Sequence, residues 1–417
     1  MNNKDTPYRS TEALRVPDIR LFIGAVGSFT LASRSLAVVI AFQIYQITHS
    51  ALALGWLGLI EAIPAIALAP FGGYIADHFN RRKVLLITRA VSVICALFLA
   101  YISSRAHHQA LPGLYAAILL TGVARGFADP ASSAFEAQVV PKHVTVNASS
   151  WIGSTWICAS VAGPAAIGFI FEARGAAGSY LTIAVFFLIS WILTVFIRPK
   201  YPSVIQEERA VFKSILTGWK ALWKIQPLVA AMALDLFAVF FGGAIILLPV
   251  YANDILHVGA KGLGLLNAAA SFGALTMMLA ATRRPPIINA GKNLLLSVAG
   301  FGVSIIVFAF SRNFFLSLVA LFFSGVFDGV SMVIRRSMLR LLSPDHLRGR
   351  IAAAGSIFIV SSNELGAFES GMVAAWIGTV PSVAAGGFVT LLIVALTARF
   401  SPQLTSLRFN KYTMNRE

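Results

Sequence analysis

Apolar runs of about 20 residues recur along nearly the whole of this 417-residue chain, with short polar breaks between them. A helix of that length crosses a hydrocarbon layer roughly 30 Å thick. The mean hydropathy is +0.78. Only 12% of the residues are charged, against about a quarter in soluble domains. A water-soluble fold could not bury this much apolar surface, so the chain is predicted to lie in a lipid bilayer.

The length of the apolar runs indicates helices and predicts an all-α membrane protein with twelve spans. Backbone groups in lipid must be satisfied within a helix or a closed barrel, and a barrel strand needs only about 10 residues. The predicted spans are residues 20–45, 52–75, 84–104, 111–139, 148–172, 177–197, 227–251, 262–281, 291–310, 314–341, 350–375 and 379–399.

The formal charge of +16 is distributed unevenly between the two sides of the predicted membrane. If both termini are cytoplasmic, the inside segments hold most of the lysines and arginines, and the outside loops hold only Arg105, Arg174, Lys261 and Arg312. This asymmetry follows the positive-inside rule. It predicts a multi-pass protein of a bacterial inner membrane, with the lipid bilayer as its partner. No basic-aromatic module indicates a nucleic-acid partner.

The predicted spans divide into two six-helix bundles of similar plan. Shifting the chain by 203 residues places Gly122 on Gly325, and a shift near 208 brings His49 close to His257. Such parallel repeats are a recurring plan of transporters, in which the substrate site lies between the halves. The predicted segments are an N-terminal tail (1–18), a first bundle (19–197), a linker (198–226), a second bundle (227–400) and a C-terminal tail (401–417).

Within the linker, residues 212–224 place apolar side chains on one face of a helix, with lysines beside them. This pattern is typical of an amphipathic helix on the inner leaflet. A solvated linker helix is an equally good interpretation.

The loop between the second and third spans carries Gly72, Gly73, Asp77, Arg81 and Arg82 in close order. This order resembles the signature loop of the major facilitator superfamily. The resemblance implies a cytoplasmic latch, formed by Gly73, Asp77, Arg81 and Arg82, that helps to close the cytoplasmic side in the outward-facing state. A charged turn that only follows the positive-inside rule is the alternative.

The fifth span contains Gly163, Pro164 and Gly168, which resemble the antiporter motif of the same superfamily. The resemblance implies a proton-driven exporter. Proline removes a backbone hydrogen bond, and small residues allow close helix contact, so a kink is predicted here. A small-residue packing face is the structural alternative.

Ionisable residues interrupt several apolar spans. Charge in lipid is costly unless it is paired or hydrated, so such residues are functional candidates. Arg125 and Asp129 are four residues apart and share a helix face. Arg125 is similar in position to the proton-transfer arginine of the superfamily. The candidates for proton coupling are Glu61, Arg125, Asp129, Asp235, Asp328 and Glu364; each alone is also open to a structural role.

Four arginines in the spans, Arg34, Arg125, Arg335 and Arg336, favour a cavity for an anionic group, because guanidinium binds carboxylate or phosphate with two bonds. The run Thr48-His49-Ser50 and residues 348–351 resemble the drug:proton antiporter and enterobactin (siderophore) exporter-like branch. Gln43 matches that branch, whereas Arg34 and Arg125 differ from it. The candidate substrate-binding residues are Arg34, Gln43, Arg335 and Arg336.

These features predict a monomeric secondary transporter that exports a small amphiphilic or anionic molecule, such as a siderophore or a drug, by alternating access. The proton gradient is its predicted energy source, and no cofactor or metal is predicted. An importer or symporter on the same fold, a lysophospholipid flippase and a ferroportin-like metal exporter are the alternatives, with a non-transporting receptor disfavoured. No phosphate loop, paired-histidine metal helix or nucleophile elbow indicates an enzyme.

Overall fold

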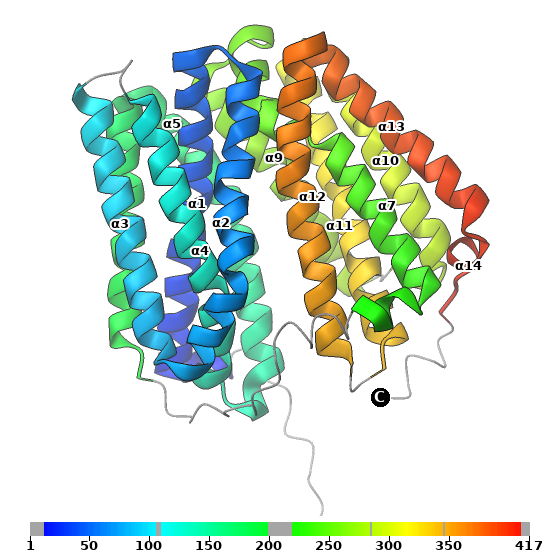
Figure 1. The fold of residues 1–417 in the computed structure, drawn as a ribbon, viewed down its shortest axis with the longest axis horizontal. Coiled ribbons are helices and arrows are strands. Elements are labelled where there is room, and N and C mark those ends of the chain that lie inside the picture. The colour runs from blue at the N-terminus through cyan, green and yellow to red at the C-terminus, as the bar shows by residue number, and fades with distance from the viewer. Residues whose placement is uncertain (1–11, 106–109, 199–218, 284–285, 345–346, 410–417) are drawn as a thin grey trace, which may run out of the picture.

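The computed structural model describes residues 12–105, 110–198, 219–283, 286–344 and 347–409. Within these residues every regular element is helical. The helices form two bundles side by side (Figure 1). The N-terminal bundle contains α1 (Pro17–Thr48), α2 (Ala51–His78), α3 (Arg81–Arg105), α4 (Leu111–Val139) and α5 (Thr145–Phe196), with short 3-10 turns at Ala13–Arg15 and Lys142–Val144.

The C-terminal bundle begins with α7 (Gln226–Gly242), which continues through the short elements η3 (Ala244–Leu247), α8 (Leu248–Val250) and η4 (Tyr251–Ile255). Its remaining helices are α9 (Gly259–Arg283), α10 (Ala290–Phe310), α11 (Phe314–Leu342), α12 (Arg348–Ile377), α13 (Thr379–Phe400) and the short α14 (Pro402–Thr405). The predicted all-α class is confirmed.

Ten helical segments of the described residues are long and apolar enough to span a membrane. One of them, α5, has 52 residues and contains a break at Gly175, where φ is +66° and ψ is −170°. This break separates the spans predicted at residues 148–172 and 177–197. If the two arms of α5 are counted separately and α12 is added, the described residues contain twelve long segments.

The seventh span was predicted as one helix over residues 227–251, but the helix is broken at Gly243. Two consecutive glycines, Gly242 and Gly243, have low helix propensity, and Pro249 follows within two turns. Neighbouring helices approach this backbone closely. A Cβ added at Gly386 would lie 1.9 Å from the Phe241 carbonyl oxygen. Tertiary packing therefore fixes the position of the break.

The amphipathic helix predicted for residues 212–224 lies largely outside the described residues. Its last part, residues 219–223, is helical.

The two bundles share the repeat that was predicted from the sequence. A Cβ added at Gly122 of α4 would lie 2.4 Å from the Glu61 carbonyl oxygen of α2, and one added at Gly325 of α11 would lie 1.9 Å from that of Ala270 of α9. The crossings of α4 with α2 and of α11 with α9 are therefore equivalent. His49 and His257 also correspond: they follow α1 and η4 with φ of 47° and 51°.

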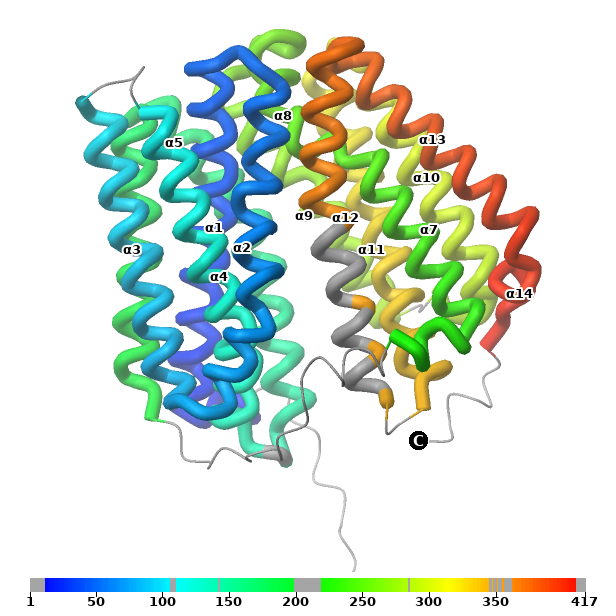
Figure 2. The backbone as a smooth tube through the Cα atoms, in the orientation of Figure 1, coloured from blue at the N-terminus to red at the C-terminus, as the bar shows by residue number. Residues whose placement is uncertain are grey.

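The bundles meet at the end of the molecule where α1 and α2 are joined, and spread apart toward the end that carries the α2–α3 turn (Figures 1 and 2). At the closed end, a Cβ added at Gly371 of α12 would lie 2.6 Å from the Gly55 Cα of α2. One added at Gly264 of α9 would lie 3.1 Å from the Gly168 Cα of α5. Backbone-to-backbone contact therefore closes this end, and small residues make it possible.

Within the N-terminal bundle, α2 crosses α4 through Gly72 and not through its neighbour. A Cβ added at Gly72 would lie 2.1 Å from the Gly126 carbonyl oxygen, whereas one added at Gly73 would meet nothing within 4 Å. Gly73, which the resemblance places in the latch, is therefore not the glycine at this helix crossing.

We expect Gly72→Ala to lower the thermal stability of the purified protein, because the added methyl group must displace backbone, at a cost of about 1–3 kcal/mol. The matched control is Gly73→Ala, which we expect to be neutral or slightly stabilising, because alanine favours a helix by roughly 1 kcal/mol over glycine. The measurement is the apparent melting temperature in detergent. Equal melting temperatures for the two variants would contradict the assigned crossing.

Candidate functional site

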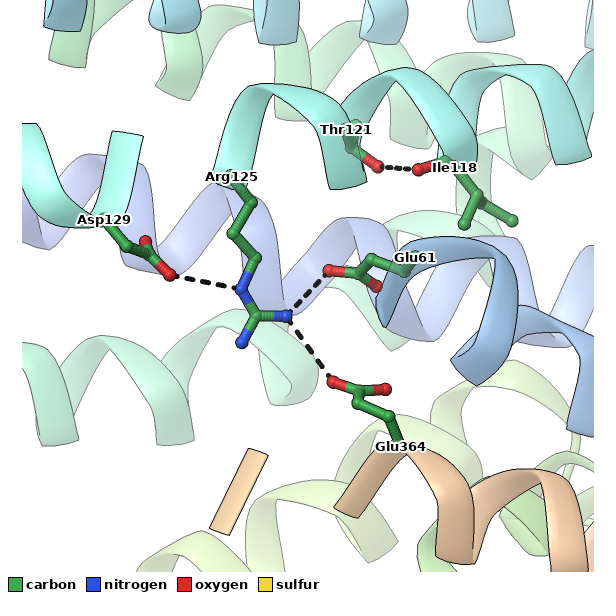
Figure 3. A network of polar contacts seen from close by, with 6 residues as sticks. All are labelled: Glu61, Ile118, Thr121, Arg125, Asp129 and Glu364. Atoms are coloured by element: carbon green, nitrogen blue, oxygen red, sulfur yellow. Dashed lines mark hydrogen bonds and ion pairs between the residues drawn. The ribbon is translucent and has the colours of Figure 1, made fainter. Parts of the chain in front are cut away.

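Three carboxylates from three helices surround the guanidinium of Arg125 (Figure 3). Its Nη1 atom lies 3.0 Å from Glu61 Oε1 of α2 and 3.5 Å from Glu364 Oε1 of α12. Its Nε atom lies 3.4 Å from Asp129 Oδ2, one turn farther along α4. We call these four residues the Arg125 cluster. The contact with Glu364 joins the two bundles by an ion pair.

Local packing explains how Arg125 reaches Glu61. Gly122 has no side chain, so the backbone of α4 lies directly against the Glu61 carbonyl group of α2. Arg125 is three residues farther along α4, which turns its side chain toward the same neighbour. Gly122 therefore sets the close contact between α4 and α2, and Arg125 reaches Glu61 across that contact.

The Arg125 cluster lies near the middle of α4 and is open on one side. The Asp129 side chain is 70% exposed, and that of Arg125 is 39% exposed. The Glu364 side chain, which belongs to the opposite bundle, is 20% exposed. Partly exposed charges at this depth need contact with water or with a polar ligand. Among the described residues, no group of His, Cys, Asp and Glu has the arrangement of a metal site.

Arg34 of α1 lies beside the Arg125 cluster but outside its ion pairs. It is exposed and lies within electrostatic range of Glu61, Glu364 and Arg125. Its guanidinium carbon lies 5.5 Å from the centre of the Trp156 ring of α5. The structure therefore brings together Arg34, as a candidate substrate-binding residue, with four of the six candidates for proton coupling.

The other two coupling candidates lie in the C-terminal bundle. Asp235 of α7 forms a close ion pair with Arg335 of α11, and the two side chains are only 7% and 11% exposed. Arg335 Nε also donates a hydrogen bond to Ser331 Oγ at 3.2 Å. Asp328 lies within electrostatic range of both partners. Arg335, predicted to bind substrate, thus has its charge compensated within its own bundle, whereas Arg336 is exposed.

Under the 203-residue shift, Asp328 occupies the position of Arg125, so an acid in the second bundle corresponds to a base in the first. The structure does not pair these two residues with each other. Arg125 contacts Glu61, Asp129 and Glu364, whereas Asp328 interacts with Arg335 in its own bundle.

Gln43, the remaining substrate-binding candidate, lies in the core of the N-terminal bundle. It is only 1% exposed. Its Oε1 atom accepts a hydrogen bond of 2.7 Å from the Tyr180 hydroxyl, and its Nε2 atom donates one of 3.0 Å to Ser103 Oγ. These bonds link α1, α3 and the second arm of α5. The structure therefore does not bring Gln43 together with Arg34.

Within the part of the chain that the structure describes, the predicted latch makes its polar contacts with the N-terminal bundle. Arg81 lies 3.7 Å from Asp77 and donates hydrogen bonds to the carbonyl groups of Ala76 and Ala134. Arg82 donates to carbonyl groups in the last turn of α5, where a cation is favoured by the helix dipole. The Asp77 side chain is 56% exposed. With the bundles spread apart at this end, Asp77 has no ion pair with the C-terminal bundle among the described residues.

The fifth-span motif has two contact faces. A Cβ added at Gly163 would lie 2.8 Å from the Leu31 carbonyl oxygen of α1, within the bundle. Gly168 instead contacts Gly264 of α9, across the bundles. The backbone remains helical through Pro164, and the non-helical values occur at Gly175. The motif therefore provides close contact in both directions.

Sequence reasoning missed a second polar link between the bundles. The Tyr45 hydroxyl of α1 donates a hydrogen bond to Asp254 Oδ2 of η4 at the closed end. The signal for it was the repeat of His49 and His257, which places the ends of α1 and η4 in equivalent positions. Tyr45 and Asp254 are 209 residues apart in the chain. Neither residue type by itself indicates the other as its partner.

Comparisons with known proteins agree with this architecture. A sequence profile of the Major Facilitator Superfamily matches residues 21–289. The chain is similar to the enterobactin exporter EntS of Escherichia coli O1:K1, with 26% identity over 361 residues that cover 87% of this chain and 86% of that protein. EntS of Shigella boydii serotype 18 is 28% identical over the same shares.

Two solved structures have a similar fold. A D-xylose–proton symporter aligns with a TM-score of 0.73 and 14% identity, and the alignment covers 94% of this chain and 99% of that chain. The inward open conformation of the xylose transporter XylE from E. coli aligns with a TM-score of 0.68 and 14% identity, over 92% and 96% of the two chains.

Breaking the buried pair of Asp235 and Arg335 from one side should destabilise the protein by about 3–5 kcal/mol, because it leaves an uncompensated charge. We expect Arg335→Gln to be less stable than Asp235→Asn, since the loss of Arg335 leaves both Asp235 and Asp328 without a cation. The double variant D235N/R335Q should be more stable than R335Q. Apparent melting temperatures in detergent measure the order, with Ser331→Ala as a control that loses about 1 kcal/mol. A double variant less stable than both single variants would contradict the pairing.

Proposed function

The chain belongs to the major facilitator superfamily, and we propose that this multi-pass membrane transporter is a secondary active exporter that exchanges protons for a small amphiphilic or anionic molecule. A siderophore or a drug is the class of cargo we propose. The observation that carries the proposal is the Arg125 cluster, in which an arginine of one bundle holds carboxylates of both bundles.

The Arg125 cluster can couple a proton to the arrangement of the bundles. While Glu364 is ionised, its attraction to Arg125 holds α12 beside α4. A proton on Glu364 removes that charge and leaves Arg125 to Glu61 and Asp129 of its own bundle. Because a charge pair in low dielectric is strong, loss of one partner shifts the balance between two arrangements. Alternating access requires such a shift.

The spread of the bundles supports an inward-facing state. The positive-inside rule assigns the end with Arg81 and Arg82 to the cytoplasm. The bundles are apart at that end and packed through glycine backbones at the other (Figure 1). The proposal therefore includes both termini in the cytoplasm, a bacterial inner membrane and a monomer as the working unit, with the proton gradient as the energy source.

The membrane potential favours export over import for an anionic cargo. Moving one negative charge out of a cell that is negative inside gains about 2.3 kcal/mol per 100 mV, and moving one proton in gains the same amount. Exchange of an anion for protons therefore uses the potential in both half-reactions. An importer of the same anion would work against it.

Two observations support an anionic or amphiphilic cargo. The relatives that match over most of the chain are named as enterobactin exporters. In addition, Arg34 and Arg336 remain exposed in membrane helices, while the charges of Arg125 and Arg335 are compensated by carboxylates. The sequence analysis assigned four arginines to a possible anion site. Because two of them are paired with carboxylates, Arg34 and Arg336 are the two that remain available to bind an anion.

We expect Glu364→Gln to abolish proton-coupled transport, because an amide side chain cannot take up and release a proton as the Glu364 carboxylate does. The test uses proteoliposomes with an imposed pH gradient, enterobactin as the first probe and a pH dye inside the vesicles. Wild-type protein should move enterobactin against the proton flow and lose this activity when a protonophore collapses the gradient. Transport by E364Q should fall to that of protein-free vesicles.

Glu369→Gln is the matched control, because Glu369 is a half-buried carboxylate of the same helix that lies outside the Arg125 cluster. It should transport like wild type. Transport that is indifferent to the collapsed gradient, or equal in E364Q and wild type, would disprove the coupling. If enterobactin does not move at all, metabolites in the spent medium of cells with wild-type protein and E364Q identify the cargo, and identical media would disprove export.

A further inference from the structure

The N–H donors of the Arg34 guanidinium have no acceptor among the described residues. Arg34 lies near the middle of α1, and among the described residues its side chain forms no ion pair and no hydrogen bond. A guanidinium has five N–H donors in a planar fork. At this depth, donors without partners are costly unless water or a ligand satisfies them. Arg34 differs in this respect from Arg125 and Arg335, which are held by carboxylates.

Trp156 holds this guanidinium in place. The Arg34 guanidinium carbon lies 5.5 Å from the centre of the indole ring, within the range of a cation–π contact. Trp156 lies seven residues before Gly163 on α5, so it shares the face on which Gly163 contacts α1. Its side chain is still 43% exposed. The pair therefore presents an oriented cation beside an open aromatic surface.

Of the two arginines in this region, Arg34 can accept an anion more readily than Arg125. Arg125 has three carboxylates within ion-pair distance. A second anion there must displace one of them. Glu61 and Glu364 are within electrostatic range of Arg34, but neither forms an ion pair with it. An incoming anion can therefore bind Arg34 without breaking an existing contact.

We propose that Arg34 and Trp156 form a substrate subsite for a planar aromatic anion, such as an aryl carboxylate or a phenolate. The inference rests on the proposed function and names one part of its cargo. The anion accepts hydrogen bonds from the guanidinium fork, and the ring packs on the exposed part of the indole. Trp156 is then a specificity residue, since it distinguishes an aromatic anion from an aliphatic anion of similar size.

The test measures equilibrium binding of two acids with the same carbon skeleton, 2-naphthoate and decahydro-2-naphthoate, to the purified full-length protein in detergent. Arg34→Gln should weaken binding of both acids about tenfold or more, because both use the guanidinium. Trp156→Leu should weaken naphthoate binding about three- to tenfold and leave the saturated acid unchanged. Trp156→Phe should retain most of the preference.

The matched controls come from a similar pair on another helix. The Arg105 guanidinium carbon lies 4.9 Å from the Tyr101 ring centre at the end of α3, outside the Arg125 cluster. Arg105→Gln and Tyr101→Leu should therefore bind both acids like wild type. These two control variants show whether the loss of any exposed arginine that lies on an aromatic ring weakens binding of the two acids.

Unchanged naphthoate affinity in R34Q, or equal losses for both acids in W156L, would overturn the subsite. If R34Q does not fold, the selective loss in W156L decides the test. Binding in detergent needs no gradient, so the two proposals can fail separately. Coupled export with no effect of W156L rejects the subsite alone, whereas selective binding without coupled transport rejects the proposed function.

Discussion

A charge inside the hydrocarbon layer costs about 2.5–3.5 kcal/mol even at the mild end of the measured range, and this cost organises the interior of the molecule. Asp235 and Arg335 meet it by close pairing inside one bundle. The Arg125 cluster meets it by shared pairing on an open surface, where a guanidinium faces three carboxylates. The first arrangement is closed and fits a structural role. The second can be altered by one proton, which makes it suitable for coupling.

The second constraint is that helices in lipid associate by close packing, with no hydrophobic driving force between them. Glycine makes these contacts possible at the equivalent crossings of Gly122 and Gly325 and at the closed end, through Gly55 with Gly371. The glycines also set where charges meet, because Gly122 brings the α4 backbone to Glu61 and so positions Arg125. At the site, the close packing of α4 on α2 therefore also determines which charged side chains meet.

The predictions from sequence that succeeded rest on local or periodic properties. Span length, the break near Gly175 and the repeat of Gly122 with Gly325 each depend on chemistry that a short stretch carries by itself. The failures concern partners. Gln43 was grouped with Arg34 but belongs to a buried network, and the sequence did not show that Gly72, and not the neighbouring Gly73, is the glycine that packs against α4. Adjacent residues of a helix face directions about 100° apart. Which of them makes a contact depends on where the neighbouring helix lies.

The sequence by itself determined that the chain is an all-α membrane protein with two related bundles, because hydropathy, loop charge and repeated glycines act within each segment. It also identified the ionisable residues that lipid makes conspicuous. Only the tertiary structure decided how they pair: Arg125 with Glu364 across the bundles, Asp235 with Arg335 within one, and Arg34 on Trp156 with its donors unused by the described residues. Pairing depends on how helices distant in the chain rotate and cross, which no local pattern specifies.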